Sequence, residues 1–176
     1  FVNLYRIRDI ELTYFLQKIT TCTRISLAIE SSERQHKTTL NIISLMATRF
    51  NIVKLGLNSL DHIIDSIYWL AHCGLTHLVI TTCSYDQYRI VLNTVFSLKI
   101  FCIKHLVPDI DLDHVQVTEL IRTSSVLLTS LTVMECSLTL PYFESMLSIT
   151  SALRHLKLYS STRNVQWSLF ATFHID

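Results

Sequence analysis

The stretch Leu75-Thr76-His77-Leu78-Val79-Ile80-Thr81-Thr82-Cys83 decides the fold, because its pattern LxxLxLxxC recurs along the chain. Its apolar residues occupy the first, fourth and sixth places, and a cysteine occupies the ninth. Four further copies share the three apolar places: Ile52, Leu55 and Leu57; Leu98, Phe101 and Ile103; Leu128, Leu131 and Val133; Leu153, Leu156 and Leu158. Regular recurrence of one phrase at short intervals is typical of an array of stacked structural units.

A helical spacing of apolar residues follows each copy, so the chain predicts alternating strands and helices. Strands are expected in the quoted stretch and at residues 25–29, 53–57, 99–103, 129–133 and 154–158. Helices are expected at residues 39–49, 85–97, 141–150 and 165–173. Three more are expected to begin at the N-caps Asp9, Asp61 and Asp113 and to end at Ile19, Cys73 and Ser124, respectively. The helix at 85–97 has as its apolar positions Ile90, Leu92, Val95 and Phe96. An enlarged loop at 107–111, marked by a proline and two acids, accounts for the longest interval, from Leu98 to Leu128.

Polar or small residues alternate with the apolar places inside the predicted strands, and this distinguishes two architectures. A doubly wound parallel sheet is covered on both faces, so its strands read as continuous apolar runs. Here the intervening positions are Lys54 and Gly56, His77, Ser130 and Thr132, and His155 and Lys157. One sheet face is therefore expected to be wet. The sequence favours an α/β solenoid, in which each strand and helix contacts only the neighbouring copies.

Composition excludes several other classes of protein. Hydrophobic residues make up 49% of the 176 positions and charged residues 16%, with a net charge of +1. These values indicate a domain with a sizeable core rather than a disordered segment or a strongly charged nucleic-acid binder. Only 2 Gly are present, which argues against a glycine-built phosphate loop. The most apolar run, residues 125–140, is broken by polar residues and is shorter than the roughly 18 to 20 residues of a membrane span.

Cysteine usage predicts a reducing compartment, the cytoplasm or the nucleus. The five cysteines are Cys22, Cys73, Cys83, Cys102 and Cys136. They are odd in number and include no CxxC pair, which argues against a disulfide framework and a zinc knuckle. No basic-then-apolar leader opens the chain, and the first residue is Phe1. An imperfect copy of the phrase already occupies residues 2–10. We therefore expect a piece of a longer protein, cut inside a repeat at both ends.

An LxxLxLxx phrase followed by Asn or Cys, at about 20 to 29 residues per copy, is the signature of leucine-rich repeats. This chain resembles that family over nearly its whole length, most closely at residues 70–83 and 128–136. Because Cys83 and Cys136 fill the ninth place, it is similar to the cysteine-containing subclass, best known from F-box proteins that present substrates to a ubiquitin ligase. Other copies have Leu60, Leu106 and Ser161 there, and no F-box-like helical segment precedes the repeats.

The resemblance implies a right-handed α/β horseshoe arc with a parallel inner sheet and outer helices. It implies one domain over residues 1–176, with about seven copies of which two are incomplete. The implied function is a non-catalytic protein-interaction module that recognises substrates for an F-box-type ubiquitin ligase, whose adaptor would be reached through flanking sequence. The alternative is a leucine-rich-repeat regulator of a small GTPase or other enzyme, which would use a surface arginine such as Arg154. No cofactor, nucleic acid or membrane is expected as a partner.

Residues that suggest metal binding or a reactive thiol have simpler structural roles. Cys83 and Cys136 are expected to turn inward where the strand ends, as small buried hydrophobes with inert thiols. His72, Cys73 and His77 suggest a metal site, but His72 is expected on a helix end and His77 on the opposite, strand-lined face. Since the two imidazoles do not converge and the spacing matches no known zinc motif, no metal site is predicted.

Catalysis finds no support among the residues. The pairs Asp61-His62 and Asp113-His114 begin predicted helices, where an aspartate is most simply an N-cap. The chain contains no nucleophile elbow, no glycine-rich phosphate loop and no HExxH motif. We therefore predict that the protein is not an enzyme.

The predicted concave face is the best candidate for a binding site. The third, fifth, seventh and eighth places of each copy should leave the core, because side chains along a strand alternate between its faces. Many of these places hold the aromatic, Met and basic side chains that are favoured in protein contacts. Residue by residue, a merely solvated strand position is an equal alternative. Together these residues line an arc, and we predict that as a set they bind a protein partner. The set is Lys54, Asn58, His77, Thr81, Lys104, His105, Met134, Glu135, His155, Lys157 and Tyr159.

Overall fold

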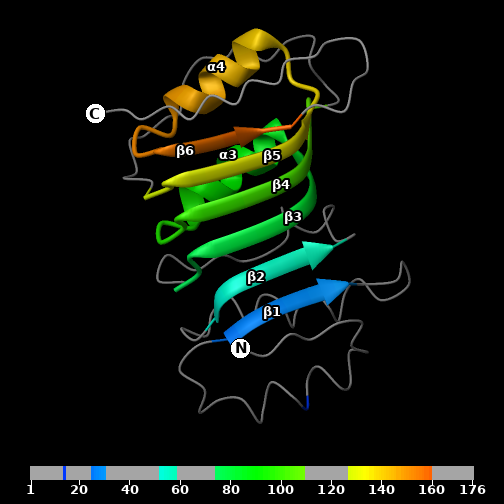
Figure 1. Ribbon diagram of the computed structural model, residues 1–176, viewed down its shortest axis with the longest axis vertical. Helices are drawn as coiled ribbons and strands as arrows, with labels where there is room; N and C mark the ends of the chain where they lie inside the picture. The colour runs from blue at the N-terminus through cyan, green and yellow to red at the C-terminus, as the bar shows by residue number, and fades with distance from the viewer. Residues whose placement is uncertain (1–13, 15–24, 31–51, 59–73, 110–126, 160–176) are drawn as a thin grey trace.

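One parallel sheet organises the part of the chain that the structure describes. A computed structural model describes residue 14 and residues 25–30, 52–58, 74–109 and 127–159. Six strands lie side by side in chain order (Figure 1): β1 (Ile25–Glu30), β2 (Ile52–Asn58), β3 (His77–Ser84), β4 (Ile100–Val107), β5 (Ser130–Cys136) and β6 (His155–Leu158). Sequential order excludes the doubly wound alternative, whose strand order reverses at a switch point. The predicted α/β class and strand positions are confirmed.

The register of the sheet reproduces the spacing of the sequence phrase. Leu78 of β3 is level with Phe101 of β4, and Phe101 is level with Leu131 of β5. Leu55 of β2 and Leu156 of β6 continue the same row at either end. All five residues hold the fourth place of their copies. Since a slip of one residue would turn every side chain to the opposite face, this row determines which face of each strand enters the core.

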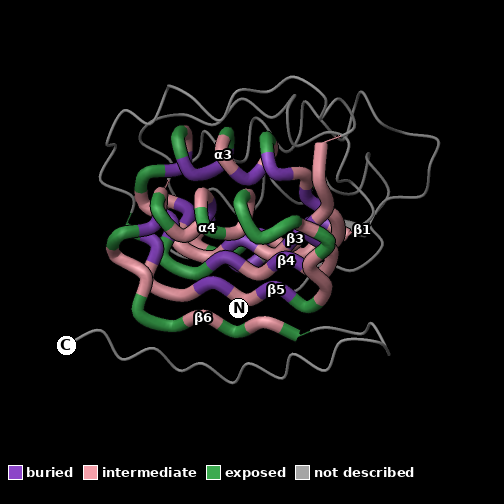
Figure 2. Tube along the Cα trace, turned by 90° about the horizontal axis from the view of Figure 1, so that it is seen from above, coloured by how far each residue is buried: buried purple, intermediate pink, exposed green. Residues whose placement is uncertain are grey.

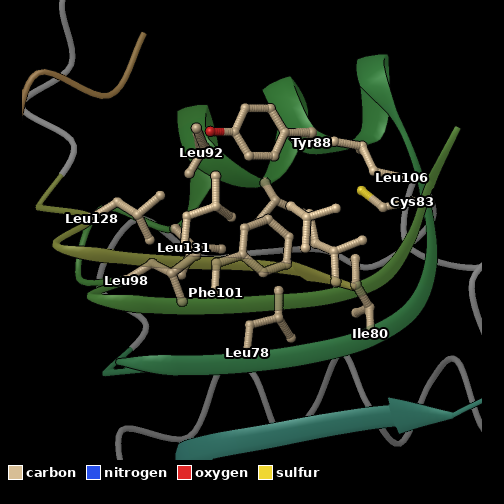
Figure 3. Close-up of a cluster of buried hydrophobic side chains, with 14 of the residues drawn as sticks. Leu78, Ile80, Cys83, Tyr88, Leu92, Leu98, Phe101, Leu106, Leu128 and Leu131 are labelled. Carbon is tan, nitrogen blue, oxygen red and sulfur yellow. The ribbon is translucent and has the colours of Figure 1, made fainter. Parts of the chain in front are cut away.

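The core lies between the sheet and helix α3 (Tyr85–Thr94), which covers one sheet face (Figure 3). Tyr88 of α3 stacks on Phe101, with ring centroids 5.9 Å apart and an interplanar angle of 4°. Leu92 joins them from the next turn of α3, and all three side chains are fully buried. In Figure 2 the buried part of α3 faces the strands. Burial of each such side chain stabilises the fold by about 1.5–3 kcal/mol.

Side-chain and loop contacts fix the start of α3. The Ser84 hydroxyl accepts a hydrogen bond from the Gln87 N–H at 3.2 Å, and the Gln87 side chain accepts one from the Ser84 N–H at 3.0 Å. This capping box satisfies two backbone donors that the helix itself cannot pair. Asp109, from the segment after β4, accepts the Asp86 N–H through its carboxylate at 3.2 Å. An acid at a helix N-terminus also interacts favourably with the helix dipole.

Helix α3 differs from its prediction in length and in the face that it buries. It ends at Thr94 rather than at residue 97. Ile90 and Phe96, two of the predicted apolar positions, are each 39% exposed, while Tyr85 and Tyr88 are buried in their place. The spacing of aliphatic residues alone does not identify the buried face, because two of its side chains are tyrosines. Residues three or four apart share a helix face, so burying Tyr88 turns the Ile90 side of the helix toward solvent.

The starts of the strands are joined by a repeated backbone hydrogen-bond pattern. The carbonyl of the second residue in one copy accepts from the second and third N–H groups of the next copy. The distances are 2.9–3.0 Å for Lys99 and Ile100 to Thr76, Thr129 and Ser130 to Lys99, and Arg154 and His155 to Thr129. The same connection therefore recurs from copy to copy, although the chain between the strands differs in length.

Helix α4 (Leu140–Ser148) has Pro141 at its start, as predicted, and contacts α3 through Tyr85. The Tyr85 and Tyr142 rings meet edge to face with centroids 5.3 Å apart. The Tyr85 and Ser145 hydroxyls form a hydrogen bond of 2.7 Å. Tyr85 thus has both an apolar and a polar partner on the helix of a later copy.

The Tyr88 hydroxyl is buried and, among the described residues, has no partner in hydrogen-bond geometry. Burial raises the pKa of Tyr88 far above its ordinary value, and the nearby Thr150 hydroxyl opposes that rise to a smaller extent. Thr150 gives its own proton to the Leu147 carbonyl, with an oxygen–oxygen distance of 3.1 Å. A buried hydroxyl without a partner costs about 1–3 kcal/mol.

Several predicted elements lie outside the described residues. They are the helix beginning near Asp9 apart from residue 14, the helices beginning near Asp61 and Asp113, those at 39–49 and 165–173, and the imperfect copy at 2–10. The count of about seven copies and the single domain over 1–176 therefore stay predictions. In the described ranges, no helix is both long and apolar enough to cross a bilayer.

The neighbours Phe101 and Ile100 provide a matched test of which sheet face holds the core. Phe101→Ala is expected to lower the free energy of unfolding by about 3–5 kcal/mol, because it removes a fully buried ring. Ile100→Ala, one residue away on the other face, is expected to cost less than about 1 kcal/mol. Urea unfolding followed by circular dichroism measures both. Equal losses would contradict the assigned faces.

The two buried tyrosines of α3 provide a second test. Tyr85→Phe removes the bond to Ser145 and is expected to lower the free energy of unfolding by about 1 kcal/mol. Tyr88→Phe removes a hydroxyl without a described partner and is expected to leave stability unchanged or raise it. Urea midpoints of the two variants give the comparison, and a larger loss from Tyr88→Phe than from Tyr85→Phe would refute it.

Candidate functional site

The sheet face opposite the core is polar, and we call it the polar face. In the copy that begins at Leu75 the first, fourth, sixth and ninth places are buried: Leu75, Leu78, Ile80 and Cys83. The first and fourth places are three residues apart, and so are the sixth and ninth. Side chains cannot simply alternate between the sheet faces over these intervals, so the two residues inside each interval both leave the core. The polar face is therefore formed by the second, third, fifth, seventh and eighth places.

Every predicted site residue lies at one of these places and is at least partly exposed. The residues separate into groups along the strand direction. Three hold the third place, near the strand starts: Lys54, His77 and His155. Lys157 holds the fifth place, in the middle of the face. Seven lie at the seventh and eighth places, near the strand ends: Asn58, Thr81, Lys104, His105, Met134, Glu135 and Tyr159. With a rise of about 3.3 Å per residue, the two ends are about 13 Å apart.

The third-place residues form a continuous row across the strand starts. Lys54 is level with His77, His77 with Ile100, Ile100 with Ser130, and Ser130 with His155. Lys99 and Arg154, at the second place, are exposed beside this row. We call this set the start band: Lys54, His77, Lys99, Ile100, Ser130, Arg154 and His155.

His77 reports the electrostatic character of the start band. Its pKa is lowered from the ordinary value of 6.5 mainly by partial burial, and then by the positive charges of Lys54 and Lys99. The His77 Nδ1 and the Thr76 hydroxyl are 2.7 Å apart, which holds the ring in place. Lys54 of β2 and Lys99, which precedes β4, therefore both act on one imidazole and lower its pKa.

The predicted site residues at the seventh and eighth places form a second group, which we call the end band: Asn58, Thr81, Lys104, His105, Met134, Glu135 and Tyr159. Within it His105 and Glu135 contact each other, with Nδ1 and Oε2 2.7 Å apart, and they are level in register. Their side chains are 43% and 44% exposed. Cross-strand contacts of this kind contribute modestly to stability. Two residues predicted as separate contacts thus form one paired unit.

Met134 and Tyr159 are the most apolar part of the end band. Each is 46% exposed. Both hold the seventh place, in adjacent copies, and the Tyr159 N–H bonds to the Val133 carbonyl at 2.9 Å. The two residues therefore occupy adjacent positions across β5 and the end of β6. Lys104, at the same place of the preceding copy, lies on their other side.

The described cysteines, Cys83, Cys102 and Cys136, have structural surroundings. Cys83 is fully buried, as predicted, and its thiol donates to the Ser84 carbonyl at 3.3 Å. Burial raises the pKa of both Cys102 and Cys136 above the ordinary range. A raised pKa keeps a thiol protonated and unreactive at neutral pH. Cys22 and Cys73 lie outside the described residues.

Two features of the polar face differ from the sequence prediction. Lys99 and Arg154 are exposed on this face but are not among the predicted site residues; the three-residue interval between the first and fourth places is the sequence signal that identifies them. Ser26 of β1, which lies in line with the third-place residues of the later strands, is buried. It is level with Lys54, and a short side chain beside a long one is easily shielded.

Metal binding finds no arrangement to support it in the described parts of the chain. There, no three His, Cys, Asp or Glu side chains gather in a way that could hold an ion. The register neighbours of His77 are Lys54 and Ile100, neither of which suits a metal. His72, Cys73 and the pairs Asp61-His62 and Asp113-His114 lie outside the described residues.

Neither a protein-family model, nor a curated protein, nor a solved structure matches this chain. Its function therefore has to be inferred from the geometry of the sheet and the chemistry of the polar face.

The pKa of His77 tests the electrostatics of the start band. We expect it below 6.5, and Lys54→Gln should raise it by removing a nearby positive charge. Lys157→Gln is the matched control, because Lys157 lies beyond about one Debye length from His77 and should leave the value unchanged. An NMR titration of the imidazole resonances measures all three, and a wild-type value of 6.5 or above would contradict the assignment.

The same shift predicts how stability depends on pH. Because the folded-state pKa of His77 is lowered, the unfolded state binds the proton more readily. The contribution of His77 to the free energy of unfolding is therefore complete above about pH 6.5, the ordinary pKa of histidine. It is lost as the pH falls through the lowered folded-state pKa.

Proposed function

We propose that this chain is a leucine-rich-repeat protein-interaction module of the cysteine-containing subclass, and that its polar face is the concave surface that binds a protein partner. From β2 to β6 the sheet pairs each place of the phrase with the same place of the next copy, which supports the repeat assignment. A fully buried cysteine at the ninth place, Cys83, supports the subclass. Exposed side chains on the opposite sheet face support the binding role.

The observation that carries the binding proposal is the pair Met134 and Tyr159. Large apolar side chains that remain about half exposed next to each other lose favourable burial as long as the surface is in water. Met and Tyr are enriched at protein interfaces, and aromatic residues often dominate their energetics. Lys104 and the His105–Glu135 pair add polar groups around this apolar centre. An apolar centre with a polar rim is the usual anatomy of a protein interface.

The proposal includes substrate recognition for an F-box-type ubiquitin ligase, in the cytoplasm or the nucleus. In such a protein the repeats bind the substrate, and a separate flanking segment binds the ligase adaptor. A pull-down with the full-length gene product should recover the adaptor, whereas residues 1–176 alone should not. Failure of the full-length product to recover it would remove this role and leave the interaction module in place.

The alternative, regulation of a small GTPase or other enzyme, is favoured by the exposure of Arg154 at a strand start. Single-turnover GTP hydrolysis by a small GTPase should then accelerate in the presence of the chain, and Arg154→Ala should abolish the acceleration. Unchanged hydrolysis would exclude this alternative for the GTPase tested.

A matched pair of double variants tests the binding face. Met134→Ala with Tyr159→Ala is expected to weaken partner binding about tenfold or more, because truncating interface centres typically costs upward of about 1 kcal/mol each. Ile90→Ala with Phe96→Ala, on the helix side and similarly exposed, should leave binding unchanged. Quantitative affinity capture from cytoplasmic and nuclear extracts measures both. Proteins captured equally by the two variants would contradict a role for the polar face.

A further inference from the structure

The start band gathers positive charge at one end of the polar face. Its charged residues are all basic: Lys54 on β2, Lys99 before β4 and Arg154 before β6. Two histidines belong to the same band, His77 at the start of β3 and His155 at the start of β6. Lys157 adds a further exposed cation two residues after His155. The net charge of the whole chain is only +1, so this gathering reflects placement rather than composition.

The acidic residues in the described part of the chain lie elsewhere. Glu30, Asp109 and Glu135 are at or beyond the carboxyl ends of β1, β4 and β5. Asp86 and Glu144 are on α3 and α4. The strand starts and the strand ends therefore carry opposite character. A ligand at the start band meets cations without a described carboxylate at the strand starts.

The start band has one exposed apolar side chain near its centre, Ile100, next to the cation Lys99. Ile100 is 37% exposed and lies between His77 and Ser130 in the row. Four steps of about 4.8 Å separate β2 from β6, a span of about 19 Å. An extended peptide covers that distance in about six residues, at about 3.3 Å per residue. The band thus has the length of a short peptide, with Lys54 and Arg154 toward its two ends and with Lys99 beside the apolar contact at Ile100 in its centre.

We propose that the start band binds an acidic segment of a protein partner, extended across the strands, with acidic residues toward both ends and an apolar residue over Ile100. This inference rests on the proposed function, because it assumes that the polar face meets a protein. Charge complementarity identifies the chemistry of the occupant and would steer its encounter with the sheet.

His77 supports this choice of ligand. Lys54 and Lys99 already act on its imidazole and disfavour its protonated form. A carboxylate bound between these lysines would reverse that effect and favour the protonated form. The site would then contribute an additional charged donor when the acidic segment is present.

A nucleic acid fits the start band less well than an acidic peptide. Single-stranded nucleic acids bind where aromatic side chains stack on successive bases along a basic groove. The row of the start band has Ile100 and Ser130 at its centre, and no Phe, Tyr or Trp occupies a described place in it. The side chains that the band offers suit carboxylates and one aliphatic contact.

Fluorescence anisotropy with the full chain tests the inference directly. The probe is a fluorescein-labelled nine-residue peptide with three acidic residues at each end and a Gly-Leu-Gly centre. We expect saturable binding that weakens several-fold when the salt is raised from about 0.05 M to about 0.5 M. The same peptide with amides in place of its carboxylates should bind about tenfold more weakly.

Charge-removing variants locate the site. Lys54→Gln, Lys99→Gln and Arg154→Gln together should weaken peptide binding about tenfold. Arg89→Gln, on α3 and therefore on the opposite side of the sheet, should change it less than about twofold. Circular dichroism and urea midpoints verify that both variants fold as the wild type does.

Three results would overturn the inference: equal binding of the acidic and amide peptides, unchanged binding by the triple variant, or tighter binding of a labelled ten-nucleotide thymidine strand than of the peptide. The capture experiment with Met134→Ala and Tyr159→Ala separates the two proposals. If that double variant loses partners while the acidic peptide fails to bind, the protein-binding face stands and only the acidic chemistry is wrong.

Discussion

The register between neighbouring parallel strands is the constraint on which the rest of the structure depends. Leu78, Phe101 and Leu131 must stay level so that their side chains meet under Tyr88. A shift by one residue would turn these apolar side chains into water and the lysines of the same strands into the core. The connection from β4 to β5 can be longer than that from β3 to β4, because the added length lies between strands and leaves the rows intact.

The same constraint creates the polar face and divides it. Since the buried places are unevenly spaced, each copy pushes two adjacent residues outward at the start of the strand and two more near its end. These pairs become the start band and the end band. Their chemistry then differs by residue choice alone: Lys99 and Arg154 flank the strand starts, whereas Met134, Glu135 and Tyr159 gather near the strand ends. Repetition in the backbone thus supports two unlike surfaces on one sheet.

Helix α3 illustrates how tertiary contacts override a simple count of apolar residues. Tyr85 and Tyr88 enter the core in preference to Ile90, because their rings reach Tyr142 and Phe101 respectively. The hydroxyl groups of these two tyrosines differ in their hydrogen bonding. Tyr85 finds Ser145, far along the chain, while Tyr88 is buried without a described partner. Aromatic area outweighs the cost of one hydroxyl here, as expected when the ring stacks inside a dense core.

The sequence by itself determined the repeated phrase, the strand positions and most of the buried and exposed places, because periodic apolar residues report local geometry directly. It therefore placed all the predicted site residues on one face. Only the tertiary structure decided which of them meet, since pairing depends on register across strands far apart in sequence: His105 with Glu135, Met134 beside Tyr159, and Lys54 and Lys99 on either side of His77. Which face α3 buries was likewise decided by packing, because a helix of mixed aliphatic and aromatic residues presents more than one face that could be covered.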